Sequence, residues 1–162
     1  MTINIKNNFK KGNEMKKTGL TILFLSMMFG FQANAWSAEH VVKMLNNGTD
    51  GIMVFEPGYL KVEKGDTVKF AAIDLGHDTI STYVPEGGTA WKGSNSKDTI
   101  VTLDAEGVYV YKCTPHSVMG MVGVIQVGKV KDKTAAEKAA VALNNTVAMN
   151  KERLIKYMAE IK

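Results

Sequence analysis

The residues of this sequence best suited to chemistry gather in one short stretch, CTPHSVMGM, at residues 113–121. It contains the only cysteine of the chain, Cys113, together with His116 and Met121 in the spacing C-x2-H-x4-M. The stretch follows one strand-like segment and precedes another, so a hairpin-like loop can bring the three side chains round one point. Thiolate, imidazole and thioether groups are ligands for soft or borderline metal ions.

A fourth ligand must come from elsewhere in the chain, and the two remaining histidines are His40 and His77. His77 is favoured because it lies where one strand-like segment gives way to the next, whereas His40 begins the first strand and is given no role. Two imidazoles, one thiolate and a weak thioether form the set that suits copper electron-transfer sites. Zinc is the main rival, but structural zinc sites normally take four Cys or His ligands.

Two other interpretations of Cys113 and its neighbours compete with a metal site. A lone cysteine is most often a small buried hydrophobic residue, and a lone methionine most often fills the core. Cys113 with His116 is also compatible with nucleophilic catalysis, but the sequence offers no clear orienting group or oxyanion donors. The combination of Cys, His and Met at this spacing favours the metal site, and we expect no catalytic residue and no enzyme.

The N-terminal residues are typical of an export signal. Lys16 and Lys17 precede an apolar run that is too short to span a bilayer comfortably, and Ala33-Asn34-Ala35 suits a signal peptidase. We therefore expect a signal peptide over residues 1–35, with 1–14 as an over-long start, rather than a membrane anchor. Residues 36–162 are then one exported domain, and we expect it to be a monomer.

The formal net charge of +4 comes from this leader, where five lysines face Glu14 alone. From Glu39 onward, 15 basic residues balance 15 acidic ones. The basic character is therefore no evidence for a nucleic-acid partner, and none is expected. A single thiol in an exported protein meets oxidants, so burial or a bound metal has to protect it.

The remaining pattern predicts an all-β domain followed by helices. Short segments rich in β-branched and aromatic residues, separated by turn signals, predict eight strands of an antiparallel sandwich or barrel, at residues 40–45, 53–56, 59–62, 67–73, 78–84, 99–103, 108–113 and 122–127. Thr134-Ala-Ala-Glu137 predicts a capping box that opens a helix over 134–144. Leu154, Met158 and Ile161 recur at helical spacing in a second helix, over 146–161, whose apolar stripe faces the sandwich.

The sequence resembles the cupredoxins, and among them the pseudoazurins. The resemblance rests on YKCTPH at 111–116, MGMVGVIQVG at 119–128 and VPEG at 84–87, on the opening HVVKMLNNGTDGIMVFEPGYLKVEKGDTVKF, and on the two C-terminal helices. It covers residues 39–162, which is nearly the whole expected mature chain.

This resemblance implies a Greek-key sandwich of eight strands that binds one type 1 copper ion through His77, Cys113, His116 and Met121, with Met121 as the axial ligand. It implies a blue copper protein that shuttles single electrons in the periplasm to a copper nitrite reductase or a similar respiratory enzyme. The partner is expected to dock near His116, in an apolar patch with Pro115, Val118 and Met119. The alternative is a protein for copper delivery or storage, against which a buried set of four ligands argues.

Several positions depart from the family, including Ser117 and Val118 after His116, and one departure directly follows an expected ligand. Where relatives usually have Asn after the first histidine ligand, this chain has Asp78. Its backbone N–H can still bond the Cys113 sulfur, and its side chain can accept a hydrogen bond from Thr114. An ionised Asp78 would favour Cu(II) and lower the reduction potential, because a nearby anion stabilises the higher charge.

Overall fold

The computed structural model describes residues 37–162, so the expected signal peptide lies outside the described residues. Two four-stranded sheets pack face to face, with strand orders β2-β1-β4-β6 and β3-β8-β7-β5. The strands are β1 (Glu39–Gly48), β2 (Gly51–Glu56), β3 (Tyr59–Val62), β4 (Thr67–Ala72), β5 (Ile80–Tyr83), β6 (Thr99–Thr102), β7 (Gly107–Lys112) and β8 (Val122–Val127). The predicted sandwich of eight strands is confirmed. Two pairs, β1 with β4 and β3 with β8, are parallel, and the other pairs within the sheets are antiparallel.

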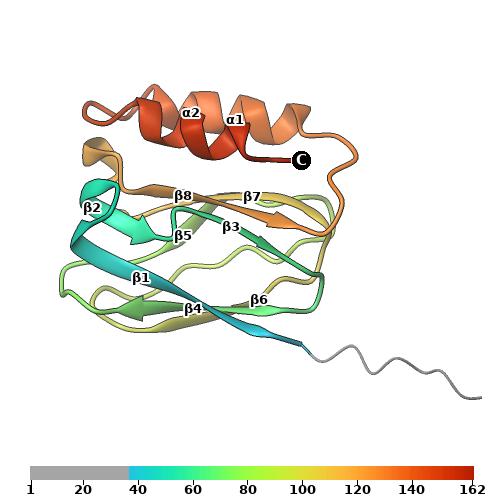
Figure 1. The fold of residues 1–162 in the computed structure, drawn as a ribbon, viewed down its shortest axis with the longest axis horizontal. Helices are drawn as coiled ribbons and strands as arrows, with labels where there is room; N and C mark the ends of the chain where they lie inside the picture. The colour runs from blue at the N-terminus through green and yellow to red at the C-terminus, as the bar shows by residue number, and fades with distance from the viewer. Residues whose placement is uncertain (1–36) are drawn as a thin grey trace, which may run out of the picture. The chain divides into compact units, whose positions relative to one another are not determined.

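The sheet that contains β7 and β8 is buried on both of its faces. Side chains alternate along a strand, so Tyr109 and Tyr111 of β7 point into the sandwich while Val108 and Val110 point outward. The helices α1 (Thr134–Asn144) and α2 (Glu152–Ala159) cover that outward face, which makes three layers (Figure 1). Double coverage explains why VYVY and VGVI lack a polar face.

Aromatic rings fill the inner core below the β7–β8 hairpin. Phe55 lies 4.8 Å from Tyr111 and 6.2 Å from Phe70 between ring centroids, in edge-to-face arrangements. Trp91 stacks on Phe70 at 5.8 Å. Full burial of a ring such as Phe55 or Phe70 stabilises the fold by roughly 1.5–3 kcal/mol, so the core beneath the hairpin is closely packed.

The second helix differs from the prediction, since it begins at Glu152 rather than at Thr146. The intervening segment cannot be helical, because Ala148 N and Met149 N both donate to the carbonyl of Val118 in the 113–121 loop, at 2.8 and 3.1 Å. Asn150 then adopts a left-handed φ of +55°. A tertiary contact has replaced one turn of helix.

The first helix runs over the predicted range, but the capping box is wrong. Thr134 is the first helical residue and caps nothing with its side chain. Instead, Asp132 Oδ1 accepts the N–H of Thr134 at 2.8 Å, and Glu137 pairs with Lys133 at 3.3 Å. The carboxylate two residues upstream therefore satisfies one of the free N–H groups at the helix N-terminus.

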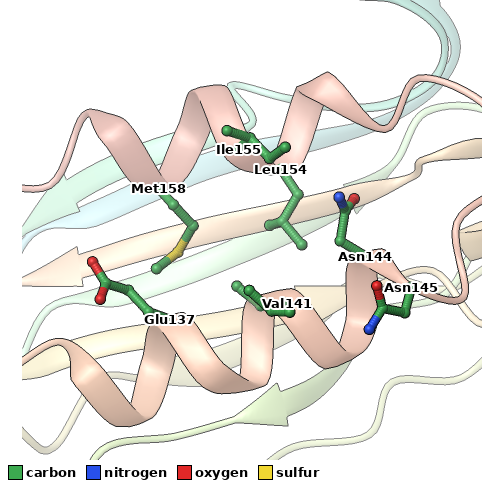
Figure 2. A pocket seen from close by; sticks show the side chains of 8 residues that line it. Glu137, Val141, Asn144, Asn145, Leu154, Ile155 and Met158 are labelled. Carbon is green, nitrogen blue, oxygen red and sulfur yellow. The ribbon is translucent and has the colours of Figure 1, made fainter.

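The predicted apolar stripe of the second helix is confirmed for Leu154, which is buried, while Met158 and Ile161 are partly buried against the same cluster. Tyr157 belongs to this face as well, and only 2% of it is exposed. On the solvent side, a groove of about 370 Å³ runs between the helices, where Val141, Leu154, Ile155 and Met158 converge (Figure 2). Among the described residues, no helix is long and apolar enough to cross a bilayer.

Asp66 ties the start of β1 to the turn before β4. Its carboxylate accepts hydrogen bonds from Ala38 N at 2.9 Å and Glu63 N at 3.1 Å, and it pairs with His40 Nε2 at 2.8 Å. Because these partners favour the ionised form, with the His40 bond as the largest cause, the pKa of Asp66 lies below its ordinary value.

We expect Asp66→Asn to lower the free energy of unfolding of the metal-free protein by about 1–2 kcal/mol at pH 7, because the amide cannot accept all three bonds. A carboxylate whose pKa is lower in the folded state than in the unfolded state stabilises the folded protein. This stabilisation is fully present above the unfolded-state pKa of about 3.9, and it is lost as the pH falls through the folded-state pKa. The difference between variant and wild type should therefore shrink below about pH 4. Urea denaturation across pH measures it, and a difference that stays constant down to pH 2 would contradict the assignment.

Candidate metal centre

The 113–121 loop joins the two central strands β7 and β8, whose last paired residues are Lys112 and Val122. Cys113 N donates to Met121 O at 3.0 Å, which continues the ladder by one bond beyond the strands. Inside the loop, the carbonyl of His116 accepts from Met119 N and Met121 N at 3.0 and 3.2 Å. A short 3-10 turn, Ser117–Met119, forms as a result. The spacing of the motif thus places Cys113 and Met121 opposite each other at the base of the loop and His116 nearer its tip.

Gly120 is the one loop position where a side chain is excluded by two separate constraints. Its φ is +82°, in the left-handed region that favours glycine. A Cβ at this position would also lie 2.7 Å from the carbonyl oxygen of Met149. Glycine here lets the turn end in time for Met121 and lets the C-terminal segment approach the loop.

His77 enters the site from the connection between β4 and β5. Two hydrogen bonds to Ser96 fix this segment, Gly76 N to Ser96 Oγ at 2.9 Å and Ser96 N to His77 O at 2.7 Å. Nε2 of His77 lies 3.1 Å from Asn46 Oδ1, which is an acceptor, so Nε2 carries the proton. The lone pair is therefore on Nδ1, the atom that faces the site.

Three ligand atoms converge on one point of the site. His77 Nδ1 and His116 Nδ1 are 3.1 Å apart, and Cys113 Sγ lies 3.9 Å from the first and 3.5 Å from the second. The circle through a triangle with these sides has a radius of about 2.0 Å, close to the bonds of roughly 2.0–2.3 Å that imidazole nitrogen and thiolate form with such metal ions. The three side chains therefore leave room for one metal ion between them.

Met121 is fully buried, with 0% of it exposed, and belongs to the same core cluster as Cys113. Cys113 and His77 are likewise buried, whereas His116 is half-buried and so links the site to the surface. His40, which the sequence left without a role, pairs with Asp66 instead of joining the site. The structure thus brings Cys113, His77 and His116 together and places Met121 beside Cys113.

Electrostatics favour a metal ligand over a nucleophile at Cys113. Burial raises the pKa of its thiol to about 11, although the backbone N–H groups of Asp78 and His116 counteract this by bonding the thiolate. The thiol is thus protonated at neutral pH unless a metal displaces the proton. Burial, and then the neighbouring His116, hold the pKa of His77 below its ordinary value. His77 is therefore neutral, as ligation requires.

The Asp78 side chain lies where the sequence predicted. Its Oδ1 accepts a hydrogen bond from the backbone N–H of Thr114 at 2.5 Å, which pins the loop residue that follows Cys113. Its carboxylate also disfavours the thiolate through charge repulsion, in opposition to the bond from its own backbone N–H. One residue thus stabilises the sulfur anion through its main chain and destabilises it through its side chain.

Sequence reasoning missed the residues that support the ligands. Asn46 belongs to Asn46-Asn47-Gly48, a turn-like run that predicted the end of the first strand, but β1 continues through Gly48. The Asn46 backbone pairs with Asp74 Oδ2 at 2.7 Å, which leaves its side chain for His77. Arg153, which donates to Gly120 O in the 113–121 loop at 2.7 Å, was also missed, although it is the only arginine in a chain with 19 lysines. That contrast was the available signal, because the two residue types are not interchangeable.

The chain is similar to known copper-binding proteins. Residues 42–128 match the family model of copper-binding proteins of the plastocyanin/azurin family. A protein of Rhizobium leguminosarum bv. viciae named as a pseudoazurin is 46% identical over 114 residues, which cover 69% of this chain and 74% of that protein. A pseudoazurin of Paracoccus pantotrophus is 38% identical over 115 residues, with 70% and 79% covered. The crystal structure of native pseudoazurin from Hyphomicrobium denitrificans superposes with a TM-score of 0.63 at 38% identity, over 77% of this chain and 99% of that one.

We expect Asp78→Asn to raise the reduction potential of the copper-loaded protein. The amide oxygen keeps the bond from Thr114 N while the negative charge disappears, so Cu(II) loses an electrostatic stabilisation that Cu(I) needs less. Redox titration of both proteins at the same ionic strength measures the shift. An unchanged or lower potential in the variant would overturn the role given to the charge.

Proposed function

Because the chain belongs to the plastocyanin/azurin family of copper-binding proteins, we propose that His77, Cys113, His116 and Met121 hold the copper ion with which this protein carries single electrons. The observation that carries the ligand assignment is the triangle of Nδ1, Nδ1 and Sγ, whose centre lies about one metal–ligand bond from each atom. Met121 completes the set from the opposite end of the same loop. Bound copper supplies the Cu(II)/Cu(I) couple.

The side chains provide conditions under which such a couple works fast. Cys113, His77 and Met121 are buried, so water and substrates are kept from the ion. Asn46 fixes the tautomer of His77, and the bond between Cys113 N and Met121 O fixes the width of the loop. A site whose ligands are held by the surrounding chain changes little between two redox states, so little energy is spent on reorganisation. His116 is the ligand that reaches the surface and therefore the exit for the electron.

The decisive experiment adds Cu(II) to the purified protein without residues 1–35 and records the visible spectrum. One equivalent should give an intense blue thiolate-to-copper band that bleaches with a mild reductant and returns with an oxidant. Cys113→Ser should lack the band while keeping the fold. A wild-type protein without the band, or one that yields its copper to a mild chelator, favours copper delivery or storage over electron transfer.

The proposal extends to the export of the protein and to its redox partner. Residues 1–35 act as a signal peptide that delivers the carrier to the periplasm as a monomer, where its thiol is protected by copper. A copper nitrite reductase, or a respiratory enzyme like it, accepts the electron. Support for this comes from the charge pattern of the leader and from the pseudoazurins among the relatives.

The surface round His116 suits a transient partner because it is apolar. Val118 on the loop is 50% exposed, and Leu75, two residues before His77, is 75% exposed. Pro115 is also exposed. Met119 is half-buried, so it adds less exposed apolar surface than the sequence suggested. We call Leu75, Pro115, Val118 and Met119 round His116 the exit patch. Few charges there mean a weak contact with fast release.

We expect Val118→Asp to lower the second-order rate of electron transfer to a copper nitrite reductase by roughly tenfold, because a charge in the centre of an apolar contact costs above 1 kcal/mol. Ile100→Asp is the matched control, since Ile100 is 63% exposed but lies on β6 of the other sheet. Stopped-flow kinetics, with the potential of each variant measured in parallel, separate docking from driving force. Equal rates for the two variants would place the docking surface elsewhere.

A further inference from the structure

The C-terminal segment holds three successive carbonyls of the copper loop. Ala148 N and Met149 N donate to Val118 O at 2.8 and 3.1 Å. Asn150 Nδ2 donates to Met119 O at 2.9 Å, and Arg153 Nη1 donates to Gly120 O at 2.7 Å. The three residues that receive these bonds directly precede Met121. All the donors come from the short stretch that the sequence predicted as helix.

Arg153 is an unusual residue to find in this place. Only 4% of the residue is exposed. Besides Gly120 O it donates to Met53 O at 2.9 Å, Asp50 O at 2.9 Å and Ile52 O at 3.2 Å. A buried cation costs several kcal/mol unless hydrogen bonds satisfy it. A planar fork with fixed N–H directions spans four carbonyls on two separate segments, which the point charge of a lysine cannot do.

The backbone is shaped for this contact from both sides. Gly120 has no Cβ, which leaves space for the carbonyl of Met149, and Asn150 has a φ of +55°, which turns the chain into α2. Asparagine is among the few residues that adopt this conformation readily. Residues 148–150 make these hydrogen bonds to the loop in place of the predicted helical ones. The segment therefore contacts specific loop atoms, whereas the helices simply cover the face of the sheet.

We propose that Ala148, Met149, Asn150 and Arg153 form a brace that sets the position of the Met121 thioether relative to Cys113, and thereby the strength of the axial interaction and the reduction potential. This inference rests on the proposed function. The thioether is the weakest of the four ligands, so the chain and not the metal decides how near it comes. Cys113 is fixed by strand β7, whereas Met121 follows a turn whose carbonyls only the brace holds from outside. Arg153 and Asn150 are therefore positioning residues for electron transfer.

Two variants that conserve charge test the brace. Arg153→Lys keeps the cation but loses the fork, and Asn150→Gly keeps the left-handed φ but loses the bond to Met119 O. Tyr157→Phe is the matched control, because its hydroxyl donates to Asp50 Oδ2 at 2.7 Å from the same helix without contacting the loop. All three variants lose hydrogen bonds that are at least partly buried, so a purely structural role would affect them alike.

The first measurement is hydrogen exchange in the copper-free proteins. The amides of Gly120 and Met121 bond the carbonyls of Ser117 and His116, and we expect them to exchange roughly tenfold faster in Arg153→Lys and Asn150→Gly. In Tyr157→Phe they should exchange as in wild type. Equal rates at these two amides in Asn150→Gly and wild type would overturn the brace. Asn150→Gly decides the matter if Arg153→Lys fails to fold.

The second measurement is made on the copper-loaded proteins. Both brace variants should show a changed ratio of the two main thiolate-to-copper bands and a higher reduction potential, because a thioether held less firmly donates less to Cu(II). Tyr157→Phe should keep the wild-type spectrum and potential. Brace variants with wild-type spectrum and potential would refute the link to the axial ligand. A wild-type protein with no blue band would refute the proposed function instead, and the exchange measurement would still decide whether the brace holds the loop.

Discussion

The hydrogen bond from Cys113 N to Met121 O holds the rest of the site together. It closes the loop at its base and pairs the backbones of the two sulfur-bearing residues. The bond is reliable because β7 and β8 are central strands with a partner on each side. The inner aromatic layer supports the hairpin from below and the two helices cover it from above, so its movement in any direction would break close packing. The copper site therefore inherits its rigidity from the sandwich.

Each ligand depends on a different part of this scaffold. Cys113 depends on β7, His77 on Asn46 of β1 and on Ser96, and Met121 on the C-terminal segment beyond the sheets. His116 is fixed chiefly by the turn in which it sits, and it is also the ligand that reaches solvent. The three buried ligands are thus held by separate elements and resist displacement. The fourth ligand, His116, is held by its own loop and can contact a partner protein.

The sequence predicted the strands well because their signals are local. Alternating or continuous runs of Val, Ile, Tyr and Phe between turn residues place all eight strands, and the spacing C-x2-H-x4-M places three ligands. Asn46, Asn150 and Arg153 were missed because their roles depend on residues far away in the chain. The sequence around Asn46 indicates a turn, and only the fold shows that its side chain accepts a hydrogen bond from His77. The sequence of residues 146–150 predicts a helix, but the N–H groups of Ala148 and Met149 donate to the carbonyl of Val118 instead. No pattern of period 2 or 3.6 records such contacts.

Burial of the Cys113 thiol also suits the role of an electron carrier. Burial raises the pKa of Cys113 to about 11, which makes the metal-free thiol unreactive and demands a bound ion to stabilise the thiolate. The same burial removes water, so a bound ion keeps its ligands through both redox states. A copper delivery protein needs the reverse, because a ligand set that opens readily must meet solvent or an incoming thiol. Of the four ligands here only His116 is partly exposed, and one exposed imidazole is enough for an electron to leave but not for the ion itself.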